Sequence, residues 1–182
     1  MRTRLRYIGN WTSGRLMPCA VMSLFAFVFL LFSCVSLDCP VNNTVECYYS
    51  LEKSTGGTDT LGVDTLWVSS PLNDENDEVV LVNRLCGSKA TKFSIPVSHT
   101  KPMDLVCLLV KDTIGTEWLD TIRVYKENYP HFESVDCKAS YFHKLTGISS
   151  TNRLIDSVSI IKQEINYDAS TPHIVLRLKA RR

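Results

Sequence analysis

The sequence lacks the short motifs that identify many enzymes. It has no G-x-x-x-x-G-K-[ST] loop and no G-x-G-x-x-G turn, so nothing supports the binding of phosphates or dinucleotides. Its four histidines stand outside any G-x-S-x-G context: His99, His131, His143 and His173. We therefore expect a protein that is not an enzyme, with no catalytic residues and no cofactor.

The sequence also has no close pairs of metal ligands. The nearest set is His131, Cys137 and His143, whose spacing is wider than the C-x2-C and H-x3-H pairs of structural zinc sites. Acidic and basic residues are nearly balanced, which leaves a formal net charge of +1. We expect neither a metal site nor a nucleic-acid partner.

One long apolar run is present, and it determines where the chain is expected to act. Residues 18–37 contain no charged side chain and follow four arginines: Arg2, Arg4, Arg6 and Arg15. This arrangement is typical of a secretory signal peptide that is cut before Leu37. Because the run approaches the roughly 20 residues of a membrane-spanning helix, an uncleaved signal anchor is the alternative. Both interpretations export residues 38–182.

Export to an oxidising compartment makes the cysteines candidates for disulfide bonds. Five of the seven cysteines lie after the apolar run: Cys39, Cys47, Cys86, Cys107 and Cys137. The odd number predicts either a buried free thiol or a covalent homodimer, and the sequence alone does not select the pairs. Asn42 begins an Asn-Asn-Thr sequon and is the expected glycosylation site.

Alternating apolar residues predict a mainly β fold. Strands are expected over residues 44–51, 92–97, 117–127 and 174–178, and over the continuous apolar run of residues 104–111, with residues 66–68 as a further candidate. A 3.6-residue spacing of apolar side chains behind Ser149–Thr151 predicts a helix over residues 151–166. The β-branched residues in that segment leave a strand as the alternative.

Cys47 and Cys107 lie on two expected strands, with Trp67 between them in sequence. This pattern resembles the bridge between sheets and the core tryptophan of immunoglobulin-like sandwiches. Cys39 and Cys47 are similar to the first cysteine pair of cytokine-receptor modules. The first resemblance implies an antiparallel β-sandwich with a bridge between its sheets, and both resemblances imply a binding module.

Together these observations predict three segments: a signal peptide or anchor at residues 1–36, a β-sandwich core at 37–130, and a C-terminal extension with a helix and a final strand at 131–182. We expect a secreted or extracellular, disulfide-stabilised glycoprotein that binds another protein at a cell surface. The alternatives are a type II single-pass membrane protein with the same exported domain and a small secreted hydrolase.

Overall fold

A computed structural model describes residue 39 and residues 44–71, 78–87 and 90–181 of the chain. The expected export segment at residues 1–36 and the sequon residue Asn42 lie outside the described residues. Within the described ranges the secondary structure consists of ten strands and no helix. The strands are β1 (Glu46–Lys53), β2 (Gly62–Pro71), β3 (Glu78–Gly87), β4 (Lys92–Pro96), β5 (Met103–Lys111), β6 (Glu117–His131), β7 (Ser140–Ser150), β8 (Ile155–Ile160), β9 (Glu164–Ile165) and β10 (Ile174–Leu178).

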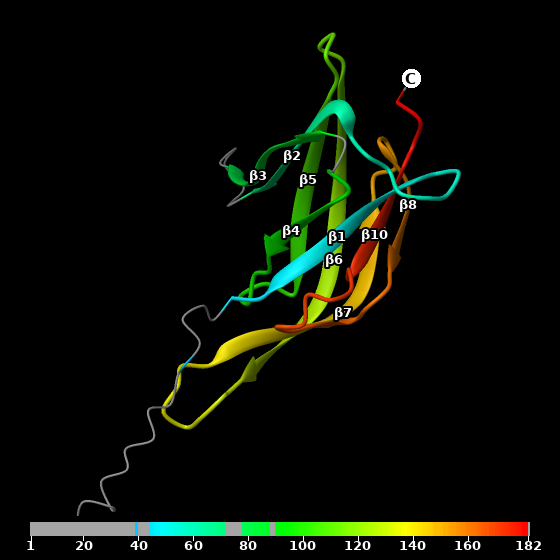
Figure 1. The fold of residues 1–182 in the computed structure, drawn as a ribbon. Coiled ribbons are helices and arrows are strands. Elements are labelled where there is room, and N and C mark those ends of the chain that lie inside the picture. Colours follow the sequence, from blue (N-terminus) through cyan, green and yellow to red (C-terminus); the bar gives the residue numbers. More distant parts are fainter. Residues whose placement is uncertain (1–38, 40–43, 72–77, 88–89, 182) are drawn as a thin grey trace, which may run out of the picture. The chain divides into compact units, whose positions relative to one another are not determined.

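The strands form two sheets. A four-stranded sheet has the order β4-β1-β10-β8, and a six-stranded sheet has the order β3-β2-β5-β6-β7-β9. The first and last strands, β1 and β10, lie side by side and run parallel, whereas the other described pairs are antiparallel (Figure 1). The expected mainly β fold is therefore confirmed.

Alternation along the strands places one face of each sheet in a shared hydrophobic core. In β5 the residues Val106, Leu108 and Val110 are buried, while the residues between them are only partly covered. In β1 the same pattern buries Tyr49 and Leu51, which join the same cluster. This period of two is what a strand with one buried face requires.

The helix expected over residues 151–166 is wrong. Strand β8 pairs with β10, and the short strand β9 pairs with β7. The branched side chains of this segment favour extended backbone, and β10 offers it an antiparallel partner. Ile161, which would belong to the buried helical face, is 53% exposed.

The turn between β7 and β8 is organised by a carboxylate from another strand. Asp120 of β6 is buried, and its oxygens accept hydrogen bonds from the backbone N–H groups of four residues between Thr151 and Ile155, besides that of Thr121. The N···O distances are 3.1 Å from Thr151, 2.9 Å from Arg153, 2.9 Å from Leu154 and 2.8 Å from Ile155. In the expected helix the N–H groups of the first residues would have had no acceptor within the helix. Here the Asp120 carboxylate is the acceptor for these groups.

Residues 39–182 form one compact unit. The expected boundary at residue 130 falls within β6, and the residues that follow it contribute strands to both sheets. The final strand expected at 174–178 is confirmed as β10, at an interior position of its sheet. Both sheets therefore depend on the C-terminal third of the chain.

Candidate functional site

Aromatic side chains gather near the tip of the β6–β7 hairpin. We call this group the aromatic patch: Tyr129, His131, Phe132, Phe142 and Tyr167. Its centre is Phe142, whose ring centroid lies 4.2 Å from His131 in a stacked pair and 5.0 Å from Tyr167 edge-on. Phe132 follows His131 in the chain and is 61% exposed. Rings held by one another in this way present apolar area to solvent at little cost in conformational entropy.

Polar contacts fix the tyrosines of the aromatic patch. The Tyr129 hydroxyl donates to Oε2 of Glu164 at 2.7 Å, and the Tyr167 hydroxyl lies 2.5 Å from Oγ of Ser140. Burial and the adjacent Glu164 carboxylate raise the pKa of Tyr129 to about 12. Tyr129 is therefore a neutral hydrogen-bond donor at physiological pH.

The single disulfide of the described chain lies in the loop of the same hairpin. Cys137 of the β6–β7 loop is bonded to Cys39, which is 98 residues earlier in sequence. Disulfides are typical of proteins in oxidising compartments, so the bond agrees with an extracellular type of environment. It connects the beginning of the described chain to the loop beside the aromatic patch.

A cavity of about 720 Å³ is lined by residues of both sheets. Tyr49 and Ile95 contribute from the four-stranded sheet, and Leu81, Val106 and Val124 contribute from the six-stranded sheet. Polar lining comes mainly from the β4–β5 loop and the beginning of β5: Ser98, Thr100, Lys101 and Asp104. The cavity is therefore apolar along most of its wall and polar at one end. Its volume lies within the range of small-molecule sites.

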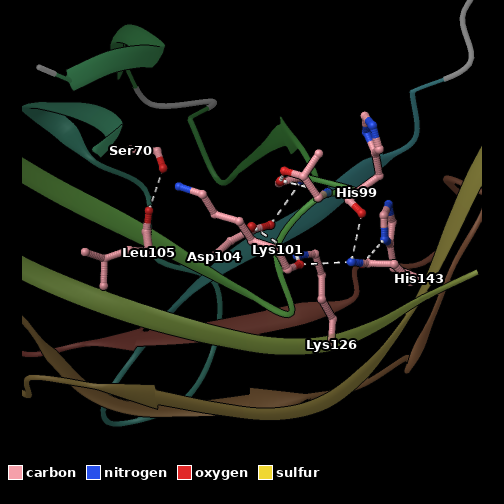
Figure 2. A network of polar contacts seen from close by, with 10 residues as sticks. Ser70, His99, Lys101, Asp104, Leu105, Lys126 and His143 are labelled. Atoms are coloured by element: carbon pink, nitrogen blue, oxygen red, sulfur yellow. Dashed lines mark hydrogen bonds and ion pairs between the residues drawn. The ribbon is translucent and has the colours of Figure 1, made fainter. Parts of the chain in front are cut away.

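The polar end of the cavity is held by a buried ion pair, drawn in Figure 2. The Lys126 side chain is fully buried, and its Nζ lies 3.0 Å from Oδ1 of Asp104 and donates to the Lys101 carbonyl at 2.7 Å. The other carboxylate oxygen of Asp104 accepts from the backbone N–H of Ser98 at 3.2 Å. A buried charge is tolerated only when it is paired and hydrogen-bonded in this way.

Asn128 and His143 extend this network. The Asn128 amide nitrogen donates to the carbonyl of His99 at 3.2 Å and to that of Lys101 at 2.9 Å. The amide oxygen then accepts from Nδ1 of His143 at 2.7 Å, which places the proton on that nitrogen. Burial, followed by the nearby Lys126 and His99 charges, lowers the pKa of His143 to about 4. His143 is therefore neutral at physiological pH.

The bridge between Cys47 and Cys107 that the resemblance implied is not present, because both are free cysteines. Cys47 is buried in the core, whereas Cys107 alternates with the buried Val106 and Leu108 and so faces the opposite side of β5. Trp67, expected in the core, is only half-buried, because it lies between the buried residues Leu66 and Val68.

Three cysteines of the described residues are free, and they differ in exposure. Cys47 is buried, and because burial disfavours the thiolate its pKa rises to about 12. Cys107 is half-buried, and burial raises its pKa as well. Cys86, on strand β3 at the edge of its sheet, is exposed. Cys86 is thus the accessible thiol among them.

The structure does not bring the remaining sequence candidates together. Cys137 is in a disulfide, so it cannot complete a zinc site with His131 and His143. His173 is buried, and its Nδ1 accepts from the backbone N–H of Tyr48 at 3.0 Å. His99 stacks on Tyr141, with ring centroids 4.5 Å apart. Among the residues that the structure describes, no group of three potential metal ligands is formed.

Sequence reasoning missed the aromatic patch, because its members come from three separate segments and no local pattern links them. It also missed the buried ions Asp120 and Lys126, because charged side chains are usually exposed. Their spacing was an available signal, since both are in phase with the buried Ile122 and Val124 of the same strand. From the sequence, the basic residues near the C-terminus, Arg181 among them, are expected to form a solvent-exposed face. Instead Arg181 binds the buried carboxylates of Asp59 and Asp64.

Comparison with known proteins identifies a family but no activity. The profile of a family of unknown function, DUF6452, matches residues 65–177. No curated protein and no solved structure matches the chain. A search of the described residues for a helix long and apolar enough to cross a membrane finds none.

Proposed function

The chain belongs to DUF6452, a family of unknown function, and we propose that it is a secreted β-sandwich that binds another protein through the aromatic patch. The observation that carries this proposal is the aromatic patch at the hairpin tip, in which Tyr129, Phe132 and Tyr167 are exposed and Phe142 is half-buried. The shared core of the two sheets supports the sandwich.

Aromatic side chains are enriched at protein interfaces, and tyrosine is frequent among the residues that contribute most binding energy. The patch combines apolar ring faces with tyrosine hydroxyls whose positions are already fixed by Glu164 and Ser140. A partner would therefore meet a surface that needs little reorganisation. The Cys39–Cys137 bond stiffens the adjacent loop further.

Site-specific photo-crosslinking in the producing cells tests this proposal. A photoreactive amino acid placed at Phe132 or Tyr167 should yield one discrete adduct with the same partner. The matched control is Ile114, an 88% exposed apolar residue in the β5–β6 turn, at the other end of strand β6. The double variant Phe132→Ser/Tyr167→Ser should bind the identified partner at least about tenfold more weakly. Equal adducts from Ile114, or none from the patch, would contradict the proposal.

A second part of the proposal concerns self-association. Cys86 is exposed on an edge strand, and an edge strand can pair with another chain. We infer a disulfide-linked homodimer through Cys86, which would run as a dimer in non-reducing electrophoresis. Cys86→Ser should abolish that band, whereas Cys107→Ser should leave it. A dimer that persists in Cys86→Ser would overturn this inference.

The proposal includes export with cleavage before Leu37, and the intact mass of the secreted product measures this directly. A product that begins at Leu37 is expected. A product that retains residues 1–36 would instead support the type II membrane protein. Glycosylation at Asn42 belongs to the same proposal and would appear in the same mass as an added glycan that Asn42→Gln removes.

A further inference from the structure

The cavity between the sheets separates apolar from polar groups along its length. Tyr49, Ile95, Leu81 and Val124 line it from β1, β4, β3 and β6. Its charged lining is confined to Lys101 and Asp104, which come from the β4–β5 loop and the beginning of β5. Such a cavity is complementary to an amphiphile whose chain lies among the apolar side chains and whose head group lies at the loop.

The charge at the polar end selects the head group. The carboxylate of Asp104 is already neutralised by Lys126, at 3.0 Å, and by the Ser98 N–H. Lys101 is exposed, and Figure 2 shows its side chain extending from the network toward Ser70 and Leu105, which also line the cavity. These three ionised side chains therefore carry one excess positive charge, next to the hydroxyls of Ser98 and Thr100. An anionic head group fits this end better than a neutral or cationic one.

The loop that carries Lys101 is held in place before any ligand arrives. Its backbone carbonyl accepts from the Lys126 ammonium at 2.7 Å and from the Asn128 amide at 2.9 Å. Asn128 is in turn bonded to the buried His143. Binding would therefore not have to order this loop, which removes one of the usual costs of association.

We propose that this cavity binds a long-chain aliphatic monocarboxylate, with its carboxylate at Lys101 and its chain between the two sheets. The chain could come from a free fatty acid or from an esterified lipid, but only the free acid carries the carboxylate. The proposal concerns a different site from the aromatic patch and does not depend on the identity of its protein partner.

Displacement of a dansyl-labelled undecanoic acid from the purified full exported chain tests the proposal. Dodecanoate should displace the probe, whereas methyl dodecanoate and dodecylammonium should do so at least about tenfold less well, because they lack the anion. The Lys101→Glu variant should lose at least about tenfold in affinity for dodecanoate and should bind the ester as before. Lys138→Glu, an exposed lysine of the β6–β7 loop, is the matched control and should change nothing.

Variants that fill the cavity test whether dodecanoate binds there or at another apolar surface of the protein. Val79 lines the cavity and is 40% exposed, so Val79→Trp should fill space without disturbing the core, and binding of both dodecanoate and its ester should fall. Met103→Trp is the second variant, used if Val79→Trp changes the circular dichroism spectrum. No displacement by dodecanoate, equal displacement by acid and ester, or unchanged binding in the folded blocking variant would overturn the proposal.

Discussion

Asp120 is the buried carboxylate whose removal should disturb the fold most. Asp120→Ala leaves the N–H groups of residues 153–155 without their acceptor, and those of Leu154 and Ile155 are buried. Since each buried group without a partner costs about 1–3 kcal/mol, we expect a loss of at least about 3 kcal/mol in the free energy of unfolding. Urea denaturation of the purified protein measures it.

Two further variants define the cause of that loss. Asp120→Asn keeps one oxygen but sets an amide donor against the backbone donors, so it should also be destabilised, by less than Asp120→Ala. Asp156→Asn, an exposed aspartate of β8, should stay within about 0.5 kcal/mol of the wild type. If the Asp120 and Asp156 variants were equally stable, the carboxylate would not hold the turn.

His143 should make the protein less stable as the pH falls. The folded state binds a proton at this ring only near pH 4, whereas an unfolded chain binds it near the ordinary pKa of 6.5. Between these values the unfolded state takes up more protons, so acidification favours unfolding. The expected contribution is a loss of about 3 kcal/mol in unfolding free energy between pH 7 and pH 4. Urea titrations across that range measure it.

The His143→Asn variant isolates this effect, because its amide keeps a donor near the position of Nδ1 but does not titrate. Its unfolding free energy should fall with pH by about 3 kcal/mol less than that of the wild type. His173, whose pKa is also lowered, chiefly by burial, is present in both proteins and cancels in the comparison. Parallel pH profiles would show that His143 does not cause the loss.

At the scale of elements, the stability of β10 depends on the residues that follow it. Arg181 donates from Nε to Asp64 at 2.8 Å and from Nη1 to Asp59 at 3.0 Å. These contacts attach the residues that follow β10 to the loop between β1 and β2, through Asp59, and to the beginning of β2, through Asp64. Arg181→Ala would leave two buried carboxylates unpaired, so we expect a loss of about 3 kcal/mol in unfolding free energy.

Thermal and urea denaturation of Arg181→Ala and Arg181→Lys measure this effect. Arg181→Lys should recover only part of the stability, because one ammonium group cannot donate to both carboxylates from separate nitrogen atoms as the guanidinium does. Arg153→Ala, an exposed arginine, is the control and should be nearly neutral. An Arg181→Ala protein as stable as this control would mean that the ion pairs contribute nothing net.

For the whole molecule, the Cys39–Cys137 bond closes a loop that contains strands β1 to β6. Cross-linking so long a loop lowers the entropy of the unfolded chain, which in the chain-entropy account stabilises the folded state by about 4.7 kcal/mol. The double variant Cys39→Ser/Cys137→Ser should therefore unfold at a lower denaturant concentration. It should keep its strand content by circular dichroism, because both sheets keep their hydrogen bonds.

The wild type and the double variant are compared in a Cys86→Ser background, so that the inferred intermolecular disulfide is absent from both, and Cys86→Ser by itself should leave the denaturation midpoint of the monomer unchanged. Addition of a reductant should lower the midpoint of the wild type and have no effect on the double variant. Equal midpoints for the wild type and the double variant would show that the bond does not stabilise the fold.

Local alternation was enough to predict much of the fold. The continuous apolar run of residues 104–111 predicts strand β5, which the structure buries on one face only, and the alternation of residues 174–178 predicts strand β10. The mainly β class follows from the same pattern. The sequence by itself also identified the cysteines and the absence of enzyme motifs, since residue types and short motifs do not depend on which strands pair.

Tertiary structure decided what depends on residues far apart in the chain. Residues 155–160 fit a helical spacing, but pairing with β10 and the carboxylate of Asp120 made them a strand. Cys39 pairs with Cys137, which is 98 residues later in sequence, and no spacing rule contains that information. The aromatic patch and the cavity arise in the same way, because burial and contact are set by the packing of whole sheets, whereas hydrophobic periodicity reports only on neighbours along one strand.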